Sequence, residues 1–205
     1  MLKDDNGVEI IENREKAEHL GQYFASVFIR ETEFCSRSAS NAVETAGPVL
    51  NSLLFPTAVV ARELQNLKEA KSSGPDNIPA KFLKELANEF SIPLAHIFRS
   101  SIELGRLSSE WKTANIFPIY KGGARTNANN YRPDSLACIC CKIVEAIVKK
   151  ATMKFLSTEQ WTRALDEGGR VDVIHTDFTK AFDSVPHKRL IYKLSKIGIR
   201  GRLLT

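Results

Sequence analysis

The sequence predicts an α+β fold, on three observations. Most of the first 156 residues divide into stretches whose apolar residues recur every three or four positions, as on one face of a helix. Two other stretches, Trp111–Tyr120 and Arg170–Thr176, are rich in β-branched, aromatic and other apolar residues and predict strands. With 43% hydrophobic and 26% charged residues, the 205-residue chain is long and apolar enough to bury a core.

The chain begins with a predicted turn, strand and helix. Asp4–Gly7 is rich in turn-forming residues, and Val8–Ile11 is a short strand after it. Asn13 is expected to cap a helix over residues 14–30, whose apolar side chains fall on one face. Residues 31–54 show no hydrophobic period, which is typical of a loop or linker.

Helices are expected through most of the remaining chain. Thr57 is expected to cap a helix that ends near Ala70, and Gly105 stands where a left-handed residue would end another. A long helix is expected from about Ser135 to Leu156. The other predicted helices are Pro79–Leu86, Ile92–Leu104, Trp161–Asp166 and Pro186–Gly198.

Charge is divided unevenly along the chain. Residues 1–111 hold 12 Lys/Arg against 16 Asp/Glu, whereas residues 112–205 hold 17 against 8. A basic half favours a polyanionic partner such as nucleic acid, because neutralising phosphates releases counterions. The basic residues of the last predicted helix are expected either on such a nucleic-acid surface or on an ordinary solvated face. They are Lys188, Arg189, Lys193 and Lys196.

The apolar stretches and the cysteines indicate in which cellular compartment the protein is expected. No stretch is apolar for the 18 or so residues that a membrane span needs, and the N-terminus lacks the apolar core of a signal peptide. Three of the four cysteines, Cys138, Cys140 and Cys141, lie within four residues and form no disulfide framework. This favours an intracellular compartment, cytoplasmic or nuclear. A fourth metal ligand at usable spacing is missing, so we expect these thiols to be core residues.

A carboxylate follows the predicted strand Arg170–Thr176 directly. At the end of a buried strand, Asp177 could hold a metal ion beside a substrate phosphate, although a helix cap is the commoner role. Phe182 and Asp183 come next, and each alone is as readily a core or capping residue. His175, inside the strand, is expected to be packed rather than a ligand.

Four motifs occur in one order along the chain: KSSGPDNIP at Lys71–Pro79, WKTANIFPIYK at Trp111–Lys121, NYRP at Asn130–Pro133 and HTDFTKAFDSVPH at His175–His187. Together they resemble the reverse transcriptases of non-LTR, LINE-type retrotransposons, in particular the jockey-like group. The resemblance covers roughly Arg14 to the C-terminus. It implies an RNA-directed DNA polymerase, a nucleotidyltransferase with an RNA template, a DNA primer, deoxynucleotides and Mg²⁺.

The resemblance also implies residue roles. Asp177 matches the first catalytic aspartate, a ligand of both magnesium ions, and the backbone carbonyl of Phe178 would help to hold one ion. Lys121 and Arg132 match fingers residues that bind the triphosphate, and Phe182 matches the aromatic residue that excludes a 2′-hydroxyl. These residue types suit the task, because Mg²⁺ prefers oxygen ligands and arginine can bind a phosphate through two hydrogen bonds.

The chain departs from the family pattern in four ways. It lacks the Tyr-x-Asp-Asp hairpin, and its one Asp-Asp pair is Asp4-Asp5. Only a few residues separate Leu156 from Trp161, where the family has tens of residues with a Gly-Phe-Arg motif, as if a segment were deleted. Asp134 replaces the usual isoleucine, a costly change if that carboxylate is buried unpaired. We also expect the endonuclease and thumb of complete elements to be absent.

These observations predict three parts: residues 1–54 as a linker and helix region upstream of the polymerase, 55–156 as N-terminal extension and helix-rich fingers, and 157–205 as a partial palm. The palm strand is expected to leave an exposed edge along Val171–Thr176. Because one aspartate cannot hold two magnesium ions, we expect a truncated, internally deleted and inactive copy. The alternatives are a catalytically dead nucleic-acid-binding fragment and a non-functional relic.

Overall fold

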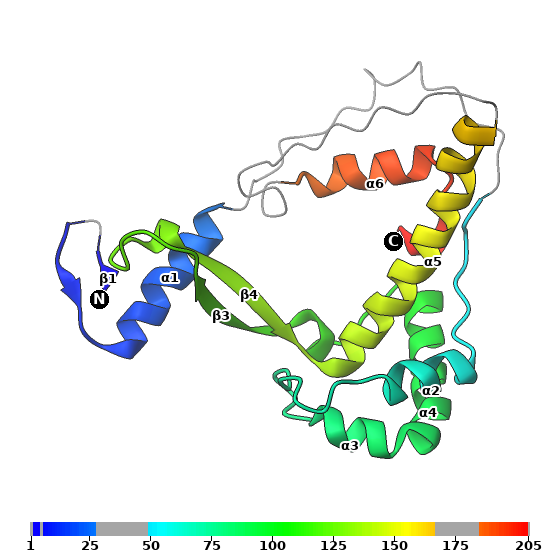
Figure 1. Ribbon diagram of the computed structural model, residues 1–205, viewed down its shortest axis with the longest axis horizontal. Helices are drawn as coiled ribbons and strands as arrows, with labels where there is room; N and C mark the ends of the chain where they lie inside the picture. The colour runs from blue at the N-terminus through cyan, green and yellow to red at the C-terminus, as the bar shows by residue number, and fades with distance from the viewer. Residues whose placement is uncertain (1, 5, 28–48, 167–184, 205) are drawn as a thin grey trace.

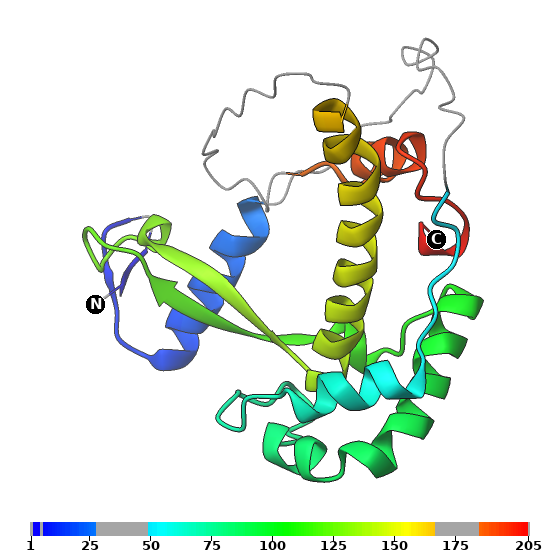
Figure 2. The same ribbon diagram turned by 45° about the vertical axis from the view of Figure 1, so that its right-hand side comes forward.

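The computed structural model describes residues 2–4, 6–27, 49–166 and 185–204, with the backbone alone for residues 157–166. A long hairpin, β3 (Ala114–Tyr120) and β4 (Tyr131–Ala137), joins a small N-terminal unit at its tip to a helical unit at its base (Figure 1). Helix α5 (Ile139–Asp166) rises from that base, and Figure 2 shows the same arrangement from a second direction. Helices combined with small sheets agree with the predicted α+β class.

The helical unit holds the main hydrophobic core. It consists of α2 (Thr57–Gln65), α3 (Ala80–Glu85), α4 (Ala87–Leu104) and the first turns of α5. At its centre the ring of Phe98 meets those of Phe55 and Trp111 edge to face, with centroid distances of 5.8 and 5.6 Å. Such aromatic contacts add to the area that Phe55 and Phe98 bury completely. None of the described helices is long and apolar enough to cross a membrane.

The predicted boundaries of α2 are wrong at both ends. Pro56 occupies the N-cap position with no side-chain cap, and Thr57 is the first helical residue. The helix ends at Gln65 rather than near Ala70, and the backbone N–H of Leu67 donates to the carbonyl of Leu64 at 3.1 Å in the turn that follows. This turn buries the side chain of Leu67, so packing outweighs the weak intrinsic preference for helix.

The long helix also begins later than predicted. Ser135–Ala137 extend β4, which pairs with β3 as far as Ala114, and α5 begins at Ile139. Pairing with β3 makes Ser135–Ala137 a strand, and the hydrophobic periodicity of the segment itself does not show this pairing. At its other end α5 continues without a break to Asp166, so the separate helix predicted from Trp161 is part of it.

Two prolines face each other in the middle of the hairpin. Pro118 is the register partner of Pro133, and the N–H of Lys121 donates to the carbonyl of Asn130 at 2.8 Å. Hydrogen-bonded and non-hydrogen-bonded pairs alternate in antiparallel strands, so the proline pair falls at a non-hydrogen-bonded position. The missing N–H groups therefore cost no ladder bond, and they make both edges of this two-stranded sheet less able to pair with another chain.

The N-terminal unit braces the hairpin tip. Strands β1 (Leu2–Lys3) and β2 (Glu9–Ile10) form the predicted small hairpin, and α1 (Asn13–Val27) follows. Asn13 is the first residue of α1 rather than its cap. A second core joins α1 to the tip through Leu2, Leu20, Phe24 and Ala128. The N–H of Lys3 donates to the carbonyl of Thr126 at 3.0 Å, which fixes the unit to the loop between β3 and β4.

The last helix is attached to the helical unit by its C-terminal end. Helix α6 (His187–Lys196) confirms the helix predicted from Pro186, which is its N-cap. After it, Ile199 forms a parallel bridge with Leu50, and Leu203 packs against the main core. The strand predicted at Arg170–Thr176 and its exposed edge lie outside the described residues, so the partial palm remains a prediction.

Gly74 allows the loop after α2 to touch the start of α5. It is buried, and a Cβ placed on it would lie 2.4 Å from both the Cα and N atoms of Cys138. Real Cβ atoms do not approach backbone this closely, so any other residue would push the loop from the helix. Gly74 therefore couples the KSSGPDNIP loop to the base of the hairpin.

We expect Gly74→Ala to lower the free energy of unfolding by about 1–3 kcal/mol, because the added methyl group overlaps backbone that cannot move independently. Urea denaturation followed by circular dichroism measures the change. The matched control is Gly21→Ala on exposed α1, where nothing lies within 4 Å of the added Cβ. That control should raise stability by about 0.5–1 kcal/mol. Equal effects of the two substitutions would contradict the close contact at Gly74.

Candidate nucleotide-binding face

Lys121 and Arg132 lie on the same face of the β3–β4 hairpin. Arg132 is the register partner of Ile119. Lys121 lies two residues after Ile119, and its N–H continues the pairing of the two strands by donating to the carbonyl of Asn130. Side chains alternate between faces, so both cations project from one side, as diagonal neighbours about 7–8 Å apart. Both are exposed, and among the described residues neither forms an ion pair within 4 Å. We call this side the open face.

The opposite face of the hairpin lies against α1. Ile116, Pro118, Pro133 and Ser135 line this side together with residues of α1, around a groove of about 420 Å³. The covered face is therefore largely apolar, whereas the open face carries Asn115, Phe117, Ile119, Lys121, Arg132, Asp134 and Leu136. The sheet is thus amphipathic, and one side is available to a polar ligand.

Local contacts fix the loop that follows Lys121. The ring of Tyr120 lies 5.6 Å from that of Tyr131, its register partner, and the guanidinium of Arg125 lies 4.7 Å over the Tyr120 ring. The hydroxyl of Tyr131 donates to the carbonyl of Arg125 at 3.0 Å, and the side-chain amide of Asn130 donates to that of Ala124 at 2.8 Å. These contacts fix the conformation of the loop between β3 and β4.

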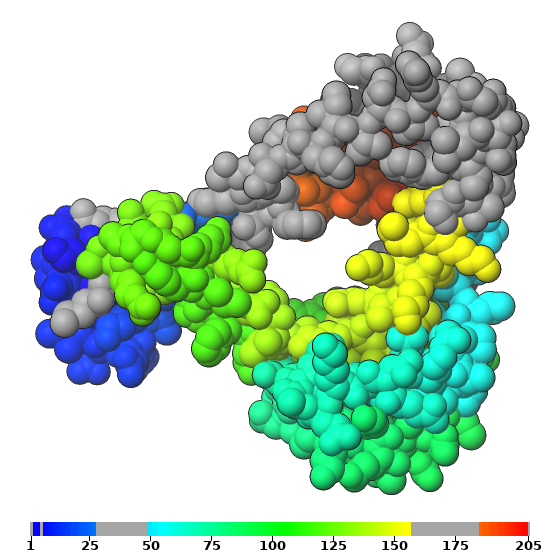
Figure 3. Space-filling model, viewed as in Figure 1, coloured from blue at the N-terminus to red at the C-terminus, as the bar shows by residue number. Residues whose placement is uncertain are grey.

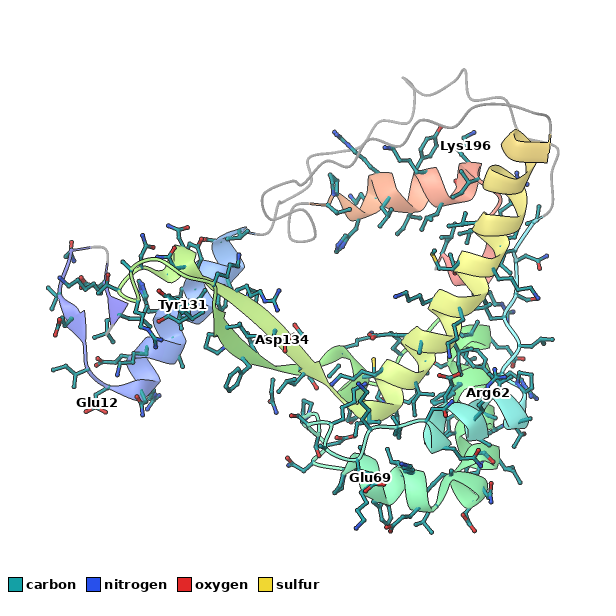
Figure 4. All side chains as sticks on the ribbon, in the orientation of Figure 1. Glu12, Arg62, Glu69, Tyr131, Asp134 and Lys196 are labelled. Carbon is teal, nitrogen blue, oxygen red and sulfur yellow. The ribbon has the colours of Figure 1, made fainter. Side chains whose placement is uncertain are left out.

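Asp134 shares the open face with the two cations. It is the register partner of Phe117 and lies two residues from Arg132 on β4; Figure 4 shows it near the middle of the hairpin, with Tyr131 nearer the tip. Its side chain is exposed, so the burial cost considered from sequence does not arise. Sequence reasoning missed its position because Ser135 was assigned to a helix. Strand alternation from Tyr131 to Ala137 would have placed Asp134 beside Arg132.

The remaining family positions of the active site, Asp177, Phe178 and Phe182, lie outside the described residues. The described part contains no group of three or more His, Cys, Asp or Glu side chains that could hold a metal ion. Asp4, of the N-terminal Asp-Asp pair, has a structural role there: its carboxylate accepts hydrogen bonds from the N–H groups of Asn6 and Val8 at 3.0 and 2.8 Å. The structure thus assembles the phosphate-binding candidates and does not describe the metal-binding ones.

Helix α6 presents its basic residues at helical spacing. Arg189, Lys193 and Lys196 follow one another by four and three positions, so they share one side of the helix. Lys188 starts the neighbouring row, and the Lys196 ammonium lies 5.5 Å from the centroid of the Tyr192 ring. In the space-filling view an opening lies between α6 and the base of the hairpin (Figure 3).

A second basic surface was not expected from sequence. A groove of about 550 Å³ between the end of α2 and α5 is lined by Lys68, Lys71 and Lys142. Its one acidic lining residue, Glu63, is paired with Lys150 at 2.6 Å. Lys142 is distant in sequence from Lys68 and Lys71, so only the packing of the α2 region on α5 brings it to them.

The three clustered cysteines belong to the main core, as predicted. Cys138, Cys140 and Cys141 are buried and free, at the base of the hairpin and the start of α5. Burial raises the pKa of all three thiols, to about 11 for Cys140 and about 12 for Cys141, where Glu145 adds a repulsive charge. A raised pKa keeps the thiols protonated, which is the opposite of what a metal ligand or nucleophile needs.

Curated proteins similar to this chain share one description. An RNA-directed DNA polymerase from the mobile element jockey of Drosophila melanogaster is 26% identical over 174 residues, covering 69% of this chain and 19% of that protein. A probable RNA-directed DNA polymerase from transposon BS of the same fly is 25% identical over 225 residues, covering 93% of this chain and 24% of its own length. The jockey polymerase of Drosophila funebris is 25% identical and covers 90% of this chain. No protein-family model matches.

The chain is similar to jockey-like reverse transcriptases of the non-LTR group. It spans about a quarter or less of the length of these curated relatives. The BS alignment is 225 residues long although it takes in 93% of 205 residues, about 191, so about 34 positions of the relative have no counterpart here. The two jockey alignments are likewise longer than the part of this chain that they cover. This difference supports an internal deletion in the chain. The predicted position of this deletion, between Leu156 and Trp161, falls inside the continuous helix α5.

We expect iodoacetamide to modify the folded chain slowly at pH 8.5, in a Cys35→Ser background that leaves the three core thiols. Burial limits access, and the raised pKa leaves few of these thiols ionised. Because the folded pKa exceeds the unfolded one, the associated stability is present below about pH 9 and is lost as pH rises toward the folded values. Mass spectrometry with and without denaturant measures the contrast. Rapid alkylation of the native chain would contradict the buried cluster.

Proposed function

We propose that this chain binds a deoxynucleoside triphosphate through the open face of the β3–β4 hairpin, as the fingers part of an RNA-directed DNA polymerase by descent. The observation that carries the proposal is the convergence of Lys121 and Arg132 on one exposed face. They come from different strands and different motifs, and strand pairing makes them diagonal neighbours. The names of the curated relatives supply the reaction class.

The chemistry of the two cations suits a polyphosphate. Arg132 offers a planar guanidinium that can donate two parallel hydrogen bonds to one phosphate, and Lys121 offers a compact charge on a flexible stem. Their separation of about 7–8 Å lets the two side chains reach adjacent phosphates of one triphosphate. The bracing of the hairpin by α1 keeps this pair in register, so little ordering is needed on binding.

We further propose that the chain's own residues do not complete a polymerase active site. Mg²⁺ would be held by Asp177 and the backbone carbonyl of Phe178, and when bound it would neutralise charge on the nucleotide phosphates. One carboxylate and one carbonyl supply few of the six oxygen ligands that Mg²⁺ requires. The sequence contains no Tyr-x-Asp-Asp motif to supply more, and the 2′-hydroxyl discrimination by Phe182 would have no reaction to serve.

A nucleic-acid-binding fragment without catalysis is the second candidate function. The basic row of α6 and the lysine-lined groove between α2 and α5 favour it, because each gathers cations on one surface. An RNA template or a DNA primer strand would present the phosphates that such surfaces bind. The two functions are compatible, since nucleotide and nucleic acid would occupy different elements.

We expect Lys121→Ala and Arg132→Ala each to weaken binding of dATP with Mg²⁺ about 10–100-fold, because each removes charge-assisted hydrogen bonds to phosphate. Isothermal titration calorimetry of the full chain measures the dissociation constants. Arg132→Lys should recover only part of the loss, since lysine cannot bind in bidentate fashion.

Lys112→Ala serves as the control, because Lys112 is exposed but precedes the hairpin. Triphosphate binding that is equal in wild type, Lys121→Ala and Arg132→Ala would refute the nucleotide site. A primer-extension assay on an RNA template tests the incomplete active site separately. Extension that disappears in Asp177→Ala would show that the chain is an active polymerase.

We expect Arg189→Gln/Lys193→Gln to weaken binding of a single-stranded RNA oligonucleotide and to reduce the slope of log K against log salt by about 1.4. Each lost phosphate contact changes that slope by about 0.7 for single strands. Fluorescence anisotropy at several salt concentrations measures it. The charge-matched control is Lys81→Gln/Lys84→Gln on α3, where both lysines pair with glutamates. Equal slopes in the two double variants would exclude α6 from the RNA-binding surface.

A further inference from the structure

We propose that Asp134 opposes triphosphate binding on the open face and so limits how tightly this chain holds a nucleotide. The inference rests on the proposed function of Lys121 and Arg132 and concerns the affinity of that same site. It follows from the position of Asp134 in the hairpin, where one extra negative charge stands among the groups that would bind phosphate.

The strand register fixes the proximity of Asp134 to Arg132. Residues two apart on one strand project from the same face, about 6.6 Å apart along the strand. Arg132 is paired with Ile119 and Asp134 with Phe117, so the cross-strand neighbours of both are apolar. Within the part of the chain that the structure describes, no cation lies within 4 Å of the Asp134 carboxylate. Arg132 is thus its nearest cation on this face.

An exposed carboxylate at this distance acts on a bound triphosphate in two ways. It repels the phosphates directly, and it offers Arg132 an alternative partner whose geometry also matches the guanidinium. Both effects weaken anion binding without altering the fold, because Asp134 is exposed and outside both hydrophobic cores. An uncharged residue at this position would have neither effect.

A carboxylate beside a triphosphate has one other possible role, as a ligand of the magnesium ion that accompanies the nucleotide. The geometry favours opposition, because the register partner of Asp134 is Phe117, and no described group of three or more acidic, histidine or cysteine side chains includes it. The two roles predict opposite changes in affinity when the charge is removed, so one measurement separates them.

The test is the dissociation constant of dATP for the full chain, with and without Mg²⁺, in wild type and in Asp134→Asn. We expect the substitution to tighten binding about three- to tenfold, with or without the metal, because it removes one exposed charge near several phosphate charges. The gain should shrink as salt is raised, since exposed charges are screened within about 10 Å at 0.1 M. Asp134→Ile should give a similar gain.

Glu12→Gln is the matched control, because Glu12 is exposed just before α1 and is remote from the open face (Figure 4). It removes the same charge and should leave the affinity unchanged. Equal or weaker binding by Asp134→Asn would overturn the inference, and weaker binding confined to Mg²⁺ would identify Asp134 as a metal-associated residue. Circular dichroism confirms that each variant is folded. Combining Asp134→Asn with Arg132→Ala should shrink the gain to the part that comes from direct repulsion of the phosphates.

The failure of this inference can be told from the failure of the proposed function. If Lys121→Ala and Arg132→Ala lose binding while Asp134→Asn binds like wild type, the nucleotide site is supported and the proposed role of Asp134 is refuted. If neither alanine variant differs from wild type, the nucleotide site itself is refuted, and a gain in Asp134→Asn that survives Arg132→Ala undiminished has another origin.

Discussion

The pairing of β3 with β4 is the interaction on which the rest of the structure depends. It places two proline residues opposite each other, where neither removes a ladder hydrogen bond, and it extends far enough to convert Ser135–Ala137 from predicted helix to strand. It also sets the alternation that separates the covered side from the open face. A shift of the register by one residue would move Lys121 relative to Arg132 and break up the pair of cations.

Two separate cores hold the ends of this hairpin. At the tip, α1 and the N-terminal strands bury Leu20, Phe24 and Ala128, and at the base Phe55, Phe98 and Trp111 meet in the helical unit. A two-stranded sheet is marginally stable by itself, so both anchors are needed to keep its faces distinct. The contact between Gly74 and Cys138 adds a link from the KSSGPDNIP loop to the base, which explains the value of glycine there.

The open face of the hairpin carries charges of both signs. Cations gather on the open face, on α6 and in the groove between α2 and α5, as expected of a protein that contacts phosphates. Yet the open face also carries Asp134, and the alignments show that tens of positions present in the relatives are missing. The described residues thus combine clustered cations with one acidic side chain on the open face.

The sequence by itself indicated the similarity to jockey-like reverse transcriptases, the α+β class and most helices. It also indicated the core role of Cys138, Cys140 and Cys141, and it singled out Lys121 and Arg132 as phosphate-binding candidates. These follow from local periodicity, from residue chemistry and from motifs in a fixed order. Only the tertiary structure decided where β4 ends, because strand pairing depends on a partner that local periodicity does not show. For the same reason it alone placed Asp134 beside Arg132 and joined Lys68, Lys71 and Lys142 around one groove.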